Sequence, residues 1–376
     1  MRIVVNTRFL LKNKLEGIGR FTYETCKLLT QNHPEHEFIF VFDRAYDDSF
    51  IFSNNITPVV IPPQSRHPIL WYLWFEWSIP QVLKKHKPDI FLSPDGYLSL
   101  RTNVPQLPVM HDLAFIHRPD DIGGLVRKYY NHYFPKFAHK AARIATVSAF
   151  SKQDIVQQYT IAPDKIDVVY NGVSGAFTPV SDEEKTAIRQ KITNGVPYFV
   201  FVGALQPRKN IVNLLKAFDS FKQSNTQGTK LVIVGRKAWQ TDDMDSTFEA
   251  MQHKSDVVFT GRLSDEDLSA TIAAALGLVY VPFFEGFGLP IIEAFKCHTP
   301  VITSNVSSMP EVLGDAGLLV EPTSVESITN AMQTLANDDV LRQNLTQKAI
   351  ERSDVFTWQK TANLLWDSIE KTVHDA

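Results

Sequence analysis

Short apolar segments alternate with amphipathic helical patterns along this 376-residue chain. The apolar segments predict buried strands, and the patterns between them predict crossover helices. Such alternation is typical of doubly wound α/β domains with parallel sheets, and the length favours two of them. The expected strands cover residues 2–6, 37–43, 57–61, 89–93, 108–112, 143–147, 166–170, 198–203, 230–235, 257–261, 278–284, 300–303 and 317–320.

One of these segments leads through two glycines directly into a helical pattern (residues 278–294). Pro290 suits the first turn of that helix, because its missing N–H would have no partner there. Gly286 and Gly288, on either side of Phe287, let a ligand approach the backbone closely. The helix N-terminus favours negative charge, so the stretch predicts a phosphate site.

Two carboxylates accompany this loop: Glu285 at the strand end and Glu293 about one turn into the helix. A diphosphate would repel both, whereas sugar hydroxyls could donate hydrogen bonds to them. A diphosphate flanked by two polyols is a nucleotide-sugar, and we expect that ligand class here. The alternative is an ordinary strand–helix turn in which Glu293 is a solvated acid.

Two adjacent cations, Arg208 and Lys209, follow the strand expected at 198–203 and precede a helix expected from Ile211. At a strand end they could clamp a diphosphate and neutralise the charge that grows as it departs. The alternative is a pair of solvated surface charges. Asn210 is expected to cap the helix.

The first half of the chain offers two further candidates. His111 follows a strand end, where open α/β sheets bind ligands, although a lone histidine can also be structural. Gly17 and Gly19 open a helix that could face an anion. They do not make a dinucleotide fingerprint, because Thr22 occupies the third glycine position, so an NAD-dependent oxidoreductase is not indicated.

Glu285 and Glu293, with seven residues and a G-F-G-L-P core between them, resemble the E-x7-E motif of retaining glycosyltransferases of family 4. Arg208-Lys209 and His111 are similar to the R-K pair and the H-D histidine of that family. The resemblance implies the GT-B architecture, in which two Rossmann-like domains face each other across a cleft. It also implies that Glu285 contacts the donor sugar, Glu293 the ribose, and His111 the sugar and the reacting centre.

The same resemblance implies domain boundaries and further donor-site residues. Residues 1–175, completed by a returning C-terminal helix at 356–376, would form the acceptor-side domain, and residues 176–355 the donor domain. The segment after residue 261 would lie beside the nucleotide base. The implied donor-binding residues are Gly17, Gly19, Arg262, Leu263, Gly286, Phe287, Gly288, Leu289, Pro290 and Glu293.

We therefore expect a retaining hexosyltransferase that acts on a saccharide or lipid-linked saccharide. The resemblance is nearest to bacterial mannosyltransferases of surface polysaccharide synthesis, so GDP-mannose is the first expectation for the donor. The alternatives are a UDP-sugar-dependent transferase and a non-catalytic nucleotide-sugar-binding protein. The latter would be marked by loss of Glu285, Lys209 or His111, and all three are present.

No cofactor or metal is expected. The D-x-D tripeptides at 243–245 and 265–267 fall in an expected polar loop and an expected helix cap, so we interpret both as non-functional. The family generally uses cationic side chains and helix dipoles in place of a metal. A nucleic-acid partner is not expected either.

Charge is divided unevenly. Residues 1–180 hold 20 Lys and Arg against 16 Asp and Glu, which gives +4, and the remainder holds 18 against 25, which gives −7. The first part could meet an anionic partner, or the difference could be chance variation. The aromatic-rich stretch at 67–87 predicts a core helix, with an interfacial helix at the inner membrane surface as the alternative.

The sequence contains no apolar run near the ~20 residues of a spanning helix. Cys26 and Cys297 lie far apart without metal-ligand spacing, so neither a disulfide nor a metal site is indicated. Together these features predict a cytoplasmic protein with reduced cysteines.

Overall fold

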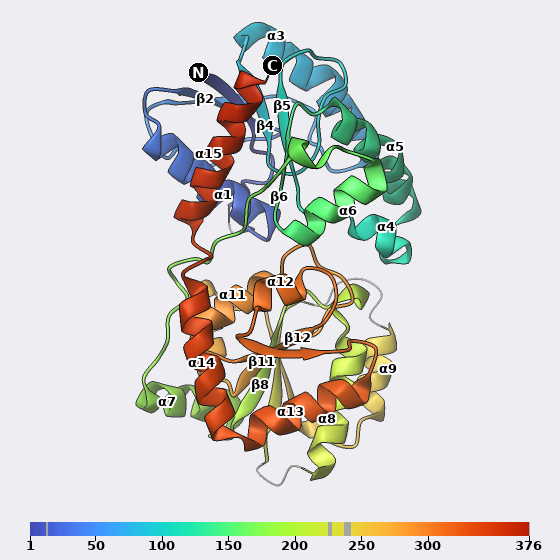
Figure 1. Cartoon of the computed structure of the whole chain (residues 1–376), viewed down its shortest axis with the longest axis vertical. Helices are drawn as coiled ribbons and strands as arrows, with labels where there is room; N and C mark the ends of the chain where they lie inside the picture. Colours follow the sequence, from blue (N-terminus) through green and yellow to red (C-terminus); the bar gives the residue numbers. More distant parts are fainter. Residues whose placement is uncertain (13, 225–227, 237–241, 376) are drawn as a thin grey trace. The chain divides into compact units, whose positions relative to one another are not determined.

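The computed structural model describes residues 1–12, 14–224, 228–236 and 242–375. The chain forms two compact units (Figure 1). Unit 1 contains Met1–Gly172 and Trp358–Ala376, and unit 2 contains Val173–Thr357. The boundaries expected at 175/176 and 355/356 lie within three residues of these divisions.

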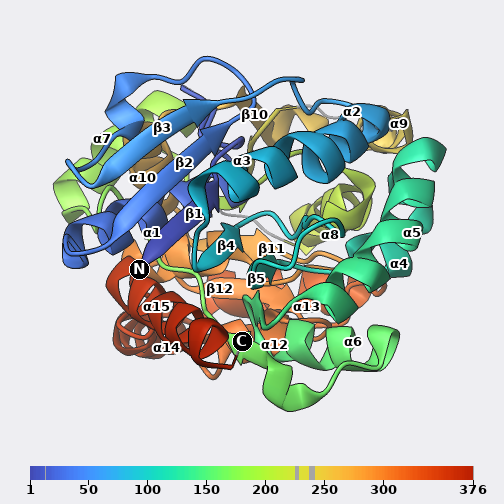
Figure 2. The same ribbon diagram turned by 90° about the horizontal axis from the view of Figure 1, so that it is seen from above.

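Unit 1 is built on a seven-stranded sheet in the order β3-β2-β1-β4-β5-β6-β7, with parallel pairing throughout. Nearly all side chains of its central strands are buried, as expected for a sheet covered on both faces. Figure 2 shows α3 and α15 on opposite sides of this sheet. The strands are β1 (Arg2–Asn6), β2 (Glu37–Phe42), β3 (Ile56–Val60), β4 (Ile90–Ser93), β5 (Gln106–Met110), β6 (Ile144–Thr146) and β7 (Ile166–Val168).

The C-terminal helix packs against the first helix of unit 1, although their sequences lie at opposite ends of the chain. At the start of the C-terminal helix, the Trp358 ring packs edge-to-face against the Phe21 ring, with the two ring centroids 6.2 Å apart. The helices of unit 1 are α1 (Ile18–Asn32), α2 (Pro68–Leu73), α3 (Ile79–His86), α4 (Ala114–His117), α5 (Gly124–Lys140), α6 (Ala149–Tyr159) and α15 (Trp358–His374).

The single helix expected at 67–87 is interrupted. Residues Trp74–Ser78 form a π-helical turn between α2 and α3, in which the Ile79 N–H bonds to the Trp74 carbonyl five residues back. Pro80 gives the physical reason, because it has no N–H to continue the α-helical ladder. Trp74 and Phe75 belong to the core, whereas Trp77 is 52 % exposed.

Unit 2 has a six-stranded parallel sheet in the order β10-β9-β8-β11-β12-β13. The expectation of two doubly wound parallel-sheet domains is therefore confirmed. The strands are β8 (Tyr198–Val202), β9 (Lys230–Val234), β10 (Val257–Gly261), β11 (Gly277–Tyr280), β12 (Val301–Ser304) and β13 (Gly317–Val320). The helices are α7 (Asp182–Thr193), α8 (Ile211–Ser224), α9 (Asp242–Ala250), α10 (Asp265–Ala273), α11 (Leu289–Lys296), α12 (Met309–Leu313), α13 (Val325–Asn337) and α14 (Asp339–Ser353).

The strand expected at 278–284 ends at Tyr280. Pro282 cannot donate to a ladder, and the Phe283 N–H bonds instead to the Arg208 carbonyl at 2.9 Å. The last residues of the apolar run are thus a loop attached to the segment that follows β8.

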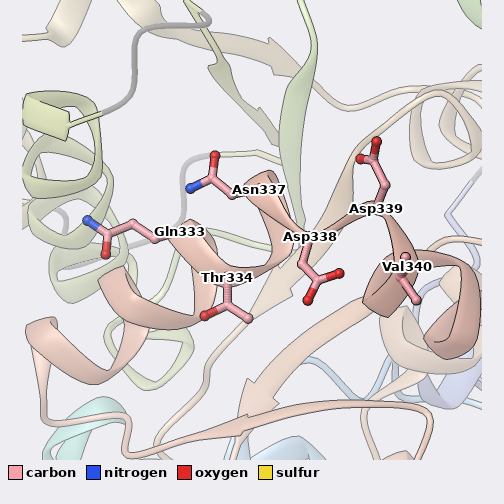
Figure 3. Close-up of a pocket in the computed structure, with 6 residues that line it drawn as sticks. All are labelled: Gln333, Thr334, Asn337, Asp338, Asp339 and Val340. Atoms are coloured by element: carbon pink, nitrogen blue, oxygen red, sulfur yellow. The ribbon is translucent and has the colours of Figure 1, made fainter.

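A surface hollow lies where α13 meets α14 (Figure 3). Leu335 of α13 packs on Gly277, the first residue of β11, which places the hollow near the amino ends of the strands. Ligands of open α/β sheets bind at the carboxyl ends, so this hollow is not the candidate site. It is lined by Gln333, Thr334, Asn337, Asp338, Asp339 and Val340.

Candidate functional site

The sheet of unit 2 reverses its strand order between β8 and β11, which pair directly with each other. Arg208 and Lys209 follow β8, and Glu285 follows β11. The fold therefore brings two cations and a carboxylate to one topological switch point, the place where doubly wound sheets bind ligands.

Glu285 joins the two cations through a single oxygen. Its Oε1 accepts hydrogen bonds from Nη1 of Arg208 and from Nζ of Lys209. Lys209 also donates to the Tyr280 hydroxyl at 2.6 Å, and Arg208 donates to the Phe284 carbonyl at 3.3 Å. Lys209 and Glu285 are buried, so these charge-assisted bonds are shielded from water.

Burial acts to raise the pKa of Glu285, but the neighbouring charges of Arg208 and Lys209 outweigh it and hold that pKa below its ordinary value. Burial raises the pKa of Tyr280 well above its ordinary value, and the Glu285 charge adds to the effect. Tyr280 is therefore a neutral hydroxyl beside an ionised carboxylate and two cations.

The depressed pKa of Glu285 predicts a pH dependence. Its contribution to stability is present above the ordinary value of 4.5 and is lost as pH falls through the lower folded-state pKa. We expect the stability advantage of the wild type over Glu285→Gln to shrink as pH falls below about 4.5. Denaturant unfolding followed by circular dichroism at several pH values measures it. An advantage that stays constant with pH would contradict the prediction.

Two serines hold the backbone of Glu285. The Ser307 hydroxyl accepts from the Glu285 N–H at 3.3 Å, and the Ser308 hydroxyl donates to the Glu285 carbonyl at 2.9 Å. Sequence reasoning missed both serines and also Tyr280. Tyr280 lay in a strand interpreted only as buried, although a tyrosine at a strand end beside predicted site residues was a usable signal.

The glycine loop after Glu285 leads into α11 as predicted. Gly288 adopts φ +99°, a conformation that residues with a side chain rarely adopt, so glycine is favoured here. Pro290 lies in the first turn, and Phe287 is buried with its ring 5.5 Å from that of Phe356. Leu289 begins the helix.

Glu293 lies half-buried on α11 about one turn beyond Leu289, on the helix that follows the loop. Its charge acts on Tyr280, because it contributes to raising the pKa of that hydroxyl. Hydrogen bonds join Arg208, Lys209, Glu285 and Tyr280, and Glu293 lies on the helix that follows their loop.

Asn210 does not cap α8 with its side chain as predicted. It adopts the left-handed conformation, φ +62°, and its Nδ2 donates to the carbonyls of Val281 and Pro322 at 2.9 and 2.7 Å. Its buried Oδ1 meets no donor among the residues that the structure describes. Tertiary bonds to the β11 loop have replaced the local cap, so Asn210 links that loop to Arg208 and Lys209.

Arg262 and Leu263 follow β10, the edge strand of the sheet. Arg262 is exposed and Leu263 is half-buried. Two strands, β9 and β8, separate β10 from β11, so these residues share the carboxyl edge of the sheet with Glu285 but are not beside it. Ser264 caps α10 by accepting from the Asp267 N–H at 3.1 Å, so the helix cap expected around 265–267 is present.

The other predicted residues lie in unit 1. His111 follows β5, and its Nε2 lies 2.7 Å from the carbonyl oxygen of Pro94. A carbonyl only accepts, so Nε2 carries the proton and the neutral ring has its lone pair on Nδ1. Burial lowers the pKa of His111, although the bond to Pro94 partly opposes the shift.

Gly17 and Gly19 begin α1 as expected. Gly19 is close-packed, because a Cβ there would lie 2.9 Å from the Phe9 carbonyl oxygen. Its N–H already bonds to the Glu16 carbonyl at 2.7 Å. Phe21, one residue after Arg20, meets the His111 ring edge-to-face with centroids 5.1 Å apart, so unit 1 brings the helix start and the histidine together.

One group of the described residues has ligating atoms close enough to hold a metal ion: His33, Glu35 and His36, before β2. It lies at the amino edge of the unit 1 sheet, whereas His111 lies at the carboxyl edge. Of the D-x-D tripeptides, 243–245 lies in α9 and not in a loop as expected, while 265–267 lies in the first turn of α10.

The model of the family described as Glycosyltransferase Family 4 matches residues 15–176, and the model described as Glycosyl transferases group 1 matches residues 182–352. The O-antigen chain mannosyltransferase B of Escherichia coli is 28 % identical over 370 residues, which cover 96 % of this chain and 97 % of that protein.

Solved structures agree on the fold. A glycosyltransferase from Rickettsia africae matches with a TM-score of 0.75 at 19 % identity, covering 100 % of this chain and 99 % of that one. Anabaena Alr3699/HepE, solved in complex with UDP-glucose, matches with a TM-score of 0.76 at 16 % identity, covering 99 % and 100 %. The two parallel-sheet units are those of the GT-B fold.

Proposed function

Because the chain belongs to the family 4, group 1 glycosyltransferases of the GT-B fold, we propose that it transfers a hexose from a nucleotide-sugar to a saccharide or lipid-linked saccharide with retention of configuration. The observation that carries the proposal is the buried meeting of Arg208 and Lys209 with Glu285 at the switch point of unit 2. These cations are placed to bind the donor diphosphate.

The reaction breaks the bond between the anomeric carbon and the diphosphate. Arg208, Lys209 and the start of α11 stabilise the charge on the departing diphosphate. Glu285 accepts hydrogen bonds from sugar hydroxyls and Glu293 from the ribose. The acceptor hydroxyl attacks from the same face and passes its proton to the leaving phosphate.

His111 acts on the sugar or the transition state from unit 1. With Nε2–H engaged by Pro94, its Nδ1 lone pair is an acceptor for a sugar hydroxyl. Its lowered pKa favours the neutral ring, which can accept, over the imidazolium, which cannot.

GDP-mannose is the donor we propose first. It is supported by the mannosyltransferase name of the relative that matches nearly the whole chain. A UDP-sugar is the alternative, supported by the structural similarity to a protein solved with UDP-glucose. No metal takes part in the proposed mechanism, since Arg208, Lys209 and the α11 terminus supply the positive charge.

We place the reaction at the cytoplasmic face of the inner membrane, through peripheral contact. Ile69, Leu73 and Trp77 are exposed apolar residues on α2 and the π-helical turn, and Arg101 lies 4.4 Å over the Trp77 ring. An apolar patch beside a cation suits an anionic headgroup layer. No helix in the described part of the chain is long and apolar enough to cross a membrane.

A thermal-shift panel tests the donor. The purified protein is heated with GDP-mannose, GDP-fucose, UDP-glucose, UDP-GlcNAc, dTDP-rhamnose or NAD, with and without EDTA. A ligand at about 100 times its Kd adds roughly 2.7 kcal/mol, which is several degrees. We expect one nucleotide-sugar to shift the wild type regardless of EDTA, and the shift to disappear in Glu293→Ala.

A shift with NAD alone, or a donor shift that survives Glu293→Ala, would contradict the proposed site. Donor binding without sugar transfer to any extracted saccharide or lipid-linked acceptor would favour the remaining alternative, a non-catalytic nucleotide-sugar-binding protein.

A further inference from the structure

Unit 1 carries a buried ion pair at its own switch point. The strand order of its sheet reverses between β1 and β4, which pair directly. Arg8 follows β1 and Asp95 follows β4, and Nε of Arg8 lies 2.5 Å from Oδ2 of Asp95. Both side chains are almost fully buried, at 3 % and 2 % exposure. Neither residue was predicted as a site residue from the sequence.

Aromatic rings enclose the cation. The guanidinium carbon of Arg8 lies 4.3 Å from the Tyr97 ring centroid, 5.0 Å from that of Phe75 and 4.9 Å from that of Phe9. Nη1 of Arg8 is buried and has no hydrogen-bond partner in the described residues. The guanidinium is therefore fixed by stacking and by one carboxylate oxygen.

The other oxygen of Asp95 organises the turn after β4. Its Oδ1 accepts from Nδ2 of Asn6 at 2.8 Å, from the Ser93 hydroxyl at 3.0 Å and from the Tyr97 N–H at 3.3 Å. Asp95 thus joins the ends of β1 and β4 to the turn at 93–97.

Within the described part of the chain, that turn supplies the one hydrogen-bond partner of the His111 ring nitrogens: the Pro94 carbonyl, 2.7 Å from Nε2. Gly96 presses the turn against the strand that carries His111, because a Cβ there would lie 3.4 Å from the Val109 carbonyl oxygen and 3.8 Å from Cα of Met110. The residue that fixes His111 lies next to Asp95 in the chain.

We propose that Asp95, held by Arg8 and Asn6, is a positioning residue that sets the ring orientation and tautomer of His111 through the Pro94 carbonyl. A buried ion pair contributes little net stability in general, because desolvation offsets the attraction. An ion pair that orients a histidine has a role beyond stability. The hydrogen bond at one ring nitrogen decides which of the two nitrogens carries the proton. The effect on catalysis rests on the proposed function, but the tautomer does not.

The charge of Asp95 also reaches the ring. Asp95 and Asp112 are the charged groups that act on His111, and both oppose the burial that lowers its pKa. The ring of Phe21 on α1 packs edge-to-face against the His111 ring, and the Ser151 hydroxyl on α6 donates to the His111 backbone carbonyl. Neutralising Asp95 should therefore lower the pKa of His111 further.

The test compares Asp95→Asn with a matched control, Asp43→Asn. Asp43 is also buried after a strand of the unit 1 sheet, pairs with Arg44 and accepts from Ser65, but it does not act on His111. Nitrogen-15 NMR of histidine-labelled protein, with the His111 signals assigned by their loss in His111→Gln, reports tautomer and pKa without any sugar-nucleotide. Asn6→Ala loosens Asp95 while leaving Arg8 paired, in case Asp95→Asn does not fold.

We expect wild type and Asp43→Asn to show His111 protonated on Nε2. In Asp95→Asn, and less strongly in Asn6→Ala, we expect Nδ1–H to appear, the pKa to fall, and kcat to drop about tenfold with the donor KM little changed. Unchanged tautomer and pKa in both variants would overturn the proposal. If those signals shift and no variant or wild type transfers sugar, the positioning role stands and the proposed function fails.

Discussion

Lys209→Met is expected to lower kcat for sugar transfer about 10²- to 10³-fold, the loss typical of removing one preorganised donor from a site of developing negative charge. Nζ of Lys209 is buried beside Glu285 and the Tyr280 hydroxyl. Steady-state transfer kinetics with the donor selected by the panel measure the effect.

Lys222→Met is the matched control. Lys222 is another buried lysine of unit 2, with 7 % of its side chain exposed, and it pairs with Asp256 at 2.9 Å. It lies near the end of α8, beside Thr229 just before β9 and therefore away from the carboxyl ends of the strands. The kcat of Lys222→Met should stay within a few-fold of the wild-type value. Equal losses in the two variants would show that Lys209 acts only through stability.

Glu285→Ala is expected to destabilise unit 2 by about 3–5 kcal/mol, because it leaves two cations in a buried site without their counter-ion. Arg208 and Lys209 share the same Glu285 oxygen, so its removal turns two attractions into one repulsion. Activity should also be lost, since the carboxylate is the proposed contact for the sugar hydroxyls. Denaturant unfolding at pH 7 measures the stability.

The double variant Lys209→Met/Glu285→Ala separates charge from packing. Removing Lys209 as well takes away one unpaired cation, so we expect the double variant to be more stable than Glu285→Ala, with a coupling of about 0.5–3 kcal/mol. Glu326→Ala, an exposed glutamate in the first turn of α13, controls for loss of a carboxylate and should change stability little. Additive effects of the two site substitutions would contradict the shared buried site.

The sequence predicted most of what strand and turn chemistry decide locally. Strands buried on both faces appear as apolar runs, which is why Arg2–Asn6 was predicted to the residue. The glycine loop before α11 was predicted from its two glycines and from Pro290 at the helix start, and Gly288 adopts a positive φ there. Arg208, Lys209 and Glu285 followed from their places at strand ends.

What the sequence did not reveal depends on contacts between distant segments. Asn210 was predicted as a cap, but two carbonyls from other loops bind its side chain. Ser307 and Ser308 reach Glu285 only because β12 lies beside β11. The α14 helix was not predicted at all, since its apolar face is narrow and most of its residues are polar.

The Arg8–Asp95 pair was also not predicted, because its partners are 87 residues apart in sequence and meet only in the folded sheet. Once the sheets are known, the two units show a common arrangement. In each, a cation after the first central strand meets a carboxylate after its neighbour, across the point where strand order reverses. In unit 1 the pair is buried beside the His111 turn, and in unit 2 it forms the proposed donor site.

The most direct test of the diphosphate site is calorimetric titration with the nucleoside diphosphate and monophosphate of the donor, in EDTA, for wild type, Lys209→Met and Lys222→Met. We expect wild type and Lys222→Met to bind the diphosphate roughly 10- to 100-fold more tightly than the monophosphate, as a charge-assisted bond of about 1.5–3 kcal/mol requires. In Lys209→Met that preference should fall about tenfold, because Arg208 and the start of α11 remain. An undiminished preference in Lys209→Met would show that the diphosphate binds elsewhere.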